Sequence, residues 1–150
     1  ALLDGQGLET DDLLVLSRKL RMDNATTKAI VQTLEVRQQL PEYQALALAD
    51  RKRLIRRPKT TDALNLAALC SGSEEQTALD VANQDHAAWA QEALFPPSLL
   101  NGSDLMEMGL KPGPRFKTLL AAVETEQLEG RLATRDDAVA LIHQLTEESP

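Results

Sequence analysis

The chain has 150 residues, 43% of them hydrophobic, and its 23 acidic and 16 basic side chains give a net charge of −7. This acidic balance argues against binding of nucleic acid through overall positive charge, because affinity for a polyanion depends on neutralising phosphates. A single cysteine, Cys70, excludes an intramolecular disulfide and a multi-cysteine zinc site, and it fits a reducing, cytoplasmic location. No run of about 18 apolar residues and no basic-then-apolar leader occurs, so neither a membrane span nor a retained signal peptide is expected.

The sequence begins with Ala1 rather than Met, and we expect it to be a fragment of a longer protein. Its length allows one sizeable core or two small ones. Apolar residues recur at helical spacing along nearly the whole chain, whereas only 3% of residues are aromatic and β-branched runs are few. These patterns predict an all-α fold, with a multi-helix bundle followed by a smaller helical hairpin unit.

Three helices are expected in the first part of the chain, over about residues 11–21, 24–39 and 42–58. Thr10 is a candidate cap for the first helix, and Asp23 or Asn24 is a candidate cap for the second. Pro41 limits the second helix, because proline cannot continue a helix from within. The third helix carries a basic run at its C-terminal end and has room for a bend near Asp50.

A short helix is expected to begin at Thr60 or Thr61 and to stop at Ser71-Gly72. A longer helix should follow from Ser73, since Ser73 and Gln76 have the spacing of a capping box, and it should end before Pro96-Pro97. Residues that precede proline favour extended backbone. We therefore predict a helical bundle over 1–95, a Pro-Pro connector at 96–97 and a helical tail unit over 98–150.

The sequence of the tail unit predicts a helix, a sharp turn and two further helices. Ser103 is a candidate cap for a helix over 103–108, and Gly109 can take the left-handed conformation that ends it. Pro112 or Pro114 can occupy the first position of a helix that runs to about residue 128. Residues 134–137, Thr-Arg-Asp-Asp, have the spacing of a capping box and predict the start of the last helix.

Two groups of cations are candidate phosphate contacts. Six of the sixteen basic residues lie within residues 51–59, a run that is alternatively a solvated helix face. The second group flanks the start of the helix at residue 114, where unpaired N–H groups and the positive end of the helix dipole suit phosphate. The candidates are Arg53, Arg56, Arg57, Lys59, Lys111, Arg115 and Lys117.

Three segments carry a family resemblance: residues 99–105 (LLNGSDL), 109–116 (GLKPGPRF) and 128–138 (LEGRLATRDDA). Together they resemble the C-terminal body and tail region of bacterial tRNA nucleotidyltransferases, the family of the CCA-adding enzymes and related poly(A) polymerases. Weaker similarity occurs at residues 20–25 and 51–70. The resemblance implies an all-helical region behind a catalytic head, placed to hold the body of a tRNA while the head extends its 3′ end.

On this basis we expect a non-catalytic RNA-binding region whose partners are tRNA or other RNA and the catalytic head of the same polypeptide, with no membrane and no DNA. The parent enzyme is expected to use Mg²⁺ and nucleoside triphosphates, whereas this segment holds no cofactor. Whether the parent adds CCA, C, A or a poly(A) tail is a property of the head. The alternative is a purely structural or protein-interaction domain without RNA contact, which the acidic total and the leucine-rich helix faces favour.

We predict no catalytic residue and no metal site in this segment. The head of the resembled family carries a Gly-Ser dipeptide followed by Asp-x-Asp, which holds two metal ions. No Asp-x-Asp follows Gly72-Ser73 or Gly102-Ser103, so we expect the head to be absent. The other candidates are expected to have structural roles. The pairs Asp11-Asp12 and Asp136-Asp137 should lie in first helical turns, and His86 and His143 at helix surfaces or boundaries. Cys70 should be buried among apolar residues, and we expect core positions rather than base stacking for Trp89, Phe95 and Phe116.

Overall fold

The computed structural model describes residues 10–70, 72 and 76–147, and all regular secondary structure in these residues is helical, which confirms the all-α fold class. The chain forms two compact units, and each contains segments that are distant in sequence. The described residues of the first unit are those up to 45 and 57–87. The second unit comprises 46–56 and the residues from 88 onward.

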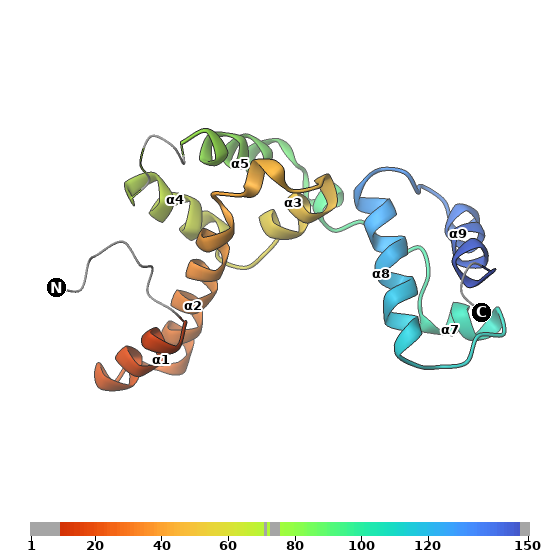
Figure 1. Cartoon of the computed structure of the whole chain (residues 1–150), viewed down its shortest axis with the longest axis horizontal. Helices are drawn as coiled ribbons and strands as arrows, with labels where there is room; N and C mark the ends of the chain where they lie inside the picture. Colours follow the sequence, from red (N-terminus) through yellow and green to blue (C-terminus); the bar gives the residue numbers. More distant parts are fainter. Residues whose placement is uncertain (1–9, 71, 73–75, 148–150) are drawn as a thin grey trace. The chain divides into compact units, whose positions relative to one another are not determined.

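The first unit contains α1 (Thr10–Lys19), α2 (Asn24–Gln39), the 3-10 helix η1 (Tyr43–Ala45), α4 (Thr60–Cys70) and α5 (Gln76–Ala88) (Figure 1). Helix α2 packs against α1 and α4. Asp23 caps α2, as predicted, because its carboxylate accepts the backbone N–H of Thr26 at 2.9 Å. The buried side chains of this unit include Val36, Leu40, Tyr43, Ala63, Leu64, Ala67, Leu79 and Ala82.

The second unit contains α3 (Leu48–Ile55), α6 (Gln91–Leu94), α7 (Gly102–Glu107), α8 (Pro114–Leu128) and α9 (Arg135–Glu147). Helix α8 contacts α3, α7 and α9, and Figure 1 shows α7 and α9 beside it. The core of this unit is an apolar cluster to which all three C-terminal helices contribute. It consists of Leu100, Leu105, Leu119, Val123, Ala138 and Ile142.

Most boundary signals of the C-terminal helices are confirmed. Gly109 ends α7 with φ of +84°, a left-handed conformation that an L side chain rarely adopts. Pro114 is the first residue of α8. At the start of α9, the Thr134 hydroxyl accepts the Asp137 N–H at 3.2 Å, and the Asp137 carboxylate accepts the Thr134 N–H at 3.2 Å.

The prediction that Ser103 caps α7 is wrong, because the capping residue is Asn101. The Asn101 side-chain oxygen accepts the N–H groups of Ser103 and Asp104, at 2.8 and 3.2 Å. The Asp104 carboxylate accepts the Asn101 N–H at 2.7 Å in return. The cap therefore lies two residues before Ser103, and this reciprocal box satisfies N–H groups that a helix start otherwise leaves unpaired.

The expected single helix over 42–58 is also wrong. The chain forms η1, leaves helical geometry, and resumes as α3 at Leu48. Ala47 precedes α3 in extended conformation and supplies no side-chain cap. The N–H of Ala49 instead donates to the Glu129 carboxylate at 2.9 Å, from 80 residues away in sequence. A local sequence pattern does not reveal a helix cap supplied by a distant residue.

The long helix expected over 73–95 is interrupted as well, since α5 ends at Ala88 and α6 begins at Gln91. No glycine or proline marks this interruption. The Trp89 ring lies at the break, with the Lys52 Nζ 5.8 Å from the ring centroid, so a contact with α3 accompanies the interruption. Most of the capping box expected at Ser73 lies outside the described residues.

The borders of the compact units lie near residues 45, 57 and 87. The division into 1–95 and 98–150 stays a prediction about domains. Residues 96–98 are non-helical. Cys70, expected to be buried, is exposed at the end of α4, where the helix extends past the buried Ala67.

Candidate functional site

The cations at the turn between α7 and α8 are exposed to solvent: Lys111, Arg115 and Lys117. We call these three residues the turn cations. Gly113 precedes α8 without a side-chain cap, in fully extended backbone with φ of 175°. The apolar neighbours Leu110 and Phe116 pack against the core of the second unit, so the turn is anchored. Arg115 also donates from Nη2 to the Leu145 carbonyl of α9 at 3.3 Å.

Arg53 and Arg56 are both paired with one carboxylate of the second unit. Arg56 Nη2 lies 2.7 Å from Glu124 Oε1, and Arg53 Nη2 lies 3.3 Å from Glu124 Oε2. Arg53 also donates to the Thr125 hydroxyl at 2.7 Å. We call Arg53, Arg56 and Glu124 the Glu124 cluster. It ties α3 to α8 through two guanidinium groups on one carboxylate.

Arg57 and Lys59 belong to the first unit and are both exposed. Lys59 has φ of +72° and forms an ion pair with Asp62 at 3.1 Å, one helical turn further along the chain. The basic run at 51–59 is therefore divided between the two units. Of its four predicted phosphate contacts, Arg53 and Arg56 belong to the second unit, and Arg57 and Lys59 belong to the first.

The cations of the Glu124 cluster hold the pKa of Glu124 below its usual value. Partial burial raises this pKa, but the hydrogen bonds and charges of Arg56 and Arg53 together outweigh burial. The exposed fractions of the three side chains are 29% for Arg53, 24% for Arg56 and 38% for Glu124. Because water still reaches these groups, the cluster stabilises the fold modestly.

Replacing Glu124 by glutamine is expected to lower the free energy of unfolding of the second unit by about 1 kcal/mol at pH 7. A folded-state pKa below the ordinary glutamate value of about 4.3 stabilises the fold above that pH, and the stabilisation is lost as the pH falls through the folded-state pKa. Urea unfolding of both proteins between pH 7 and pH 3 measures this. Exposed Glu107→Gln is the control. A stability difference that persists unchanged at pH 3 would contradict the assignment.

The family to which the chain belongs follows from comparison with known sequences. The family model described as tRNA nucleotidyltransferase domain 2 matches residues 1–142, nearly the whole chain. The chain belongs to the tRNA nucleotidyltransferase family. This confirms the resemblance carried by the segments 99–105, 109–116 and 128–138. No solved structure matches the chain.

Two curated relatives of this chain are named A-adding tRNA nucleotidyltransferases. That of Halalkalibacterium halodurans is 41% identical over 78 residues, which are 52% of this chain and 17% of the relative. That of Deinococcus radiodurans is 30% identical over 115 residues, which are 76% of this chain and 24% of the relative. The chain therefore matches at most a quarter of the length of these relatives.

The structure also places the remaining aromatic residues and histidines that the sequence singled out. Phe116 is half-buried against the core of the second unit, as expected. Phe95, expected in a core, is half-exposed, with the Arg56 guanidinium carbon 5.9 Å from its ring centroid. Trp89 is half-buried beside Lys52. His143 is exposed, and His86 is half-buried with its Nε2 3.3 Å from the Thr61 hydroxyl.

Within residues 10–70, 72 and 76–147, no group of three or more His, Cys, Asp or Glu side chains is arranged to hold a metal ion. Among the helices in these ranges, none combines the length and apolar character that crossing a bilayer requires. Sequence reasoning missed the role of Glu124, which decides how Arg53 and Arg56 are used. No local signal marks it, since Glu124 lies 68 residues beyond Arg56 in the chain.

Proposed function

We propose that this chain is the non-catalytic part of a tRNA nucleotidyltransferase that holds the tRNA while nucleotides are added to its 3′ end. The observation that carries the proposal is the exposure of the turn cations beside the uncapped N-terminus of α8, within a family whose curated members act on tRNA. Lysine and arginine in such a place bind phosphates without reading sequence. Holding a substrate in register accelerates a transfer reaction even where the holding residues do no chemistry.

The turn cations support this proposal more strongly than the basic run at residues 51–59 does. Arg53 and Arg56 already bind the Glu124 carboxylate, so an RNA phosphate would have to displace it. Arg57 and Lys59 are exposed in the first unit and are proposed as further phosphate contacts. Because such contacts are local, the net charge of −7 does not prevent them.

The chemistry of nucleotide addition is proposed to lie in the rest of the longer polypeptide, together with the Mg²⁺ and nucleoside triphosphates that it requires. Both curated relatives carry an A-adding name, which favours addition of A by the parent of this chain. A cytoplasmic location, where tRNA is processed, agrees with this role.

Reversing the charge of Lys111 and Lys117 together, by substitution with glutamate, is expected to weaken tRNA binding by at least about tenfold at low salt. The slope of log affinity against log salt should fall by about two, since two phosphate contacts are lost. Fluorescence anisotropy with deacylated tRNA, titrated across salt, measures both quantities. Arg115 is left unchanged, because its bond to the Leu145 carbonyl also supports the fold.

The matched control is Lys19→Glu with Lys28→Glu, two exposed lysines of the first unit. This double variant has the same net charge as the test variant. If both double variants lose affinity equally, total charge and not the turn governs binding. If the unaltered chain shows no salt-sensitive binding, the structural alternative stands in place of the RNA-holding role.

A further inference from the structure

Phe95 exposes an aromatic ring on a segment whose backbone is held in place. Its side chain is 49% exposed, so it does not occupy the core position expected for it. Pro96 and Pro97 follow directly and restrict the backbone. The Arg56 guanidinium donates to the Leu94 carbonyl at 3.4 Å, and its carbon lies 5.9 Å from the Phe95 ring centroid. A ring that is exposed but fixed loses little conformational freedom when a flat partner stacks on it.

A hollow of about 280 Å³ adjoins this segment, between the Pro-Pro connector and α8. Pro96, Leu120 and Val123 supply its apolar walls. The Gln127 Nε2 donates to the Pro97 carbonyl at 3.0 Å and so ties the two sides together. The volume lies just below the range of about 300–1,000 Å³ that is typical of small-molecule sites, which suits a single ring system. We call this space the α8 hollow.

The polar groups of the α8 hollow offer hydrogen-bond acceptors. Glu124 lies in its wall, and its carboxylate has more lone pairs than the arginines of the Glu124 cluster use. The Gln127 nitrogen donates to the backbone, which leaves its Oε1 as an acceptor. The Ser98 hydroxyl gives its proton to a backbone carbonyl at 2.6 Å, so its oxygen can also accept. Such a lining suits a ligand that carries an amino donor.

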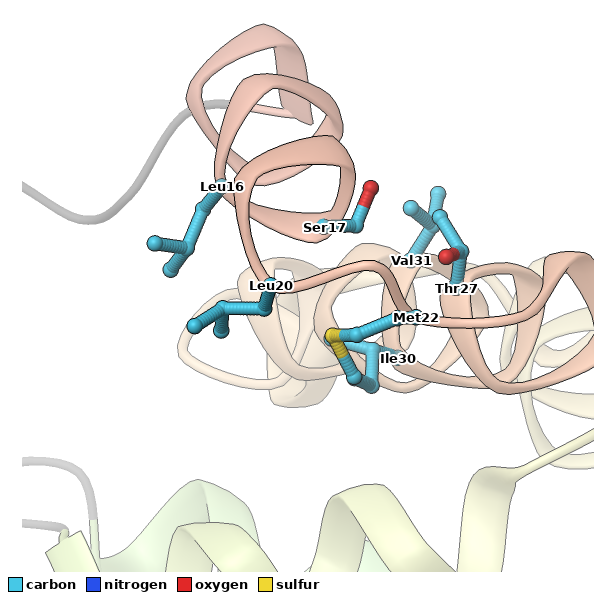
Figure 2. Close-up of a pocket in the computed structure, with 7 residues that line it drawn as sticks. All are labelled: Leu16, Ser17, Leu20, Met22, Thr27, Ile30 and Val31. Atoms are coloured by element: carbon cyan, nitrogen blue, oxygen red, sulfur yellow. The ribbon is translucent and has the colours of Figure 1, made fainter.

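The hollow between α1 and α2 differs in this respect (Figure 2). Leu16, Leu20, Met22 and Ile30 line it, and its surface is almost entirely apolar. An apolar surface has few groups with which to distinguish one nucleobase from another, because bases differ in their donors and acceptors. The α8 hollow combines acceptors with an exposed aromatic ring and the Arg56 cation beside it.

We propose that Phe95 and the α8 hollow bind an unpaired nucleobase that carries an exocyclic amino group, stacked on the ring with its amino group donating into the hollow. Aromatic side chains commonly hold unpaired bases in this way, and a neighbouring arginine adds a cation. Cytosine, adenine and guanine have such an amino group, whereas uracil has none. In RNA the inference rests on the proposed function and deepens it, because this site reads a base where the turn cations contact only phosphates.

The test is fluorescence anisotropy of the chain with labelled single-stranded hexamers of cytidine and of uridine, two pyrimidines of similar size. The cytidine hexamer should bind more tightly. Phe95→Leu keeps an apolar side chain without an aromatic face and should weaken binding of the cytidine hexamer by at least about fivefold. Phe95→Tyr keeps the ring and should retain the affinity. Met106→Ala is the matched control, since Met106 is also 49% exposed in the second unit, and it should change nothing.

Equal binding of the two hexamers, or cytidine binding that Phe95→Leu leaves unchanged, would overturn the base site. So would the absence of hexamer binding at low salt. If free cytidine monophosphate binds as tightly as the hexamer, and Phe95→Leu weakens both, the site takes free nucleotides and its assignment to RNA is wrong.

The salt dependence of tRNA binding separates this inference from the proposed function. Charge reversal at Lys111 and Lys117 should reduce the slope of log affinity against log salt, whereas Phe95→Leu should lower affinity and leave the slope unchanged. A loss in the lysine variant without a loss in Phe95→Leu would overturn the base site alone. The reverse result would overturn the phosphate contacts of the turn and keep the base site.

Discussion

Replacing Leu105 by alanine is expected to lower the free energy of unfolding of the second unit by about 2–5 kcal/mol. Leu105 is fully buried in the cluster that joins α7, α8 and α9. Removing its side chain loses apolar burial and leaves a cavity, because packed neighbours relax only partly. Urea unfolding followed by the fluorescence of Trp89, the one tryptophan of the sequence, reports on this unit.

The adjacent Met106 supplies the matched control, since it lies on the same helix but is 49% exposed. Met106→Ala should change stability by no more than about 0.5 kcal/mol. The same core anchors Leu110 and Phe116 on either side of the turn cations. Under the proposed function, Leu105→Ala should therefore also weaken tRNA binding. Equal effects of the Leu105 and Met106 substitutions on stability would show that the helices do not pack as described.

The second large effect is expected at Tyr43, in the first unit. Tyr43→Ala should lower the free energy of unfolding of that unit by about 3–5 kcal/mol, because the ring is fully buried. Tyr43→Phe keeps the ring but removes the hydroxyl, which donates to the Asp85 carboxylate at 2.8 Å. Its expected cost is nearer 1 kcal/mol, the usual net contribution of one hydrogen bond.

Urea unfolding followed by circular dichroism measures both Tyr43 variants. Trp89 belongs to the other unit, so its fluorescence transition should move much less than the dichroism transition. If the phenylalanine variant proves as unstable as the alanine variant, the hydroxyl contact and not the buried ring would dominate. That outcome would contradict the assignment of Tyr43 as a core residue.

The helix boundaries that the sequence predicts correctly are those set by neighbouring residues. Asp23, Gly109 and Pro114 act within one turn of their own positions, so their chemistry is visible locally. The two wrong helices, over 42–58 and 73–95, fail for the opposite reason. Their interruptions are accompanied by contacts with residues far along the chain, Glu129 with Ala49 and Lys52 with Trp89.

The candidate site is likewise predictable from the sequence only in part. The cationic character of both groups is visible in the sequence, as is the turn that presents Lys111 and Lys117. The pairing of Arg53 and Arg56 with Glu124 is not, because a run of arginines looks the same whether it faces water or a carboxylate. The sequence pattern also predicts burial for Cys70 and Phe95, which are exposed, because burial depends on which other helices pack against a side chain.

The sequence by itself determined the all-α class, the helix boundaries at Asp23, Gly109 and Pro114, and the family, because these depend on periodicity, on contacts within one turn and on motif order. Only the tertiary structure decided where long helical patterns are interrupted and which arginines are neutralised. These features depend on contacts between residues about 40 to 80 positions apart. The physical reason is that an apolar or charged side chain has the same local pattern with or without its distant partner.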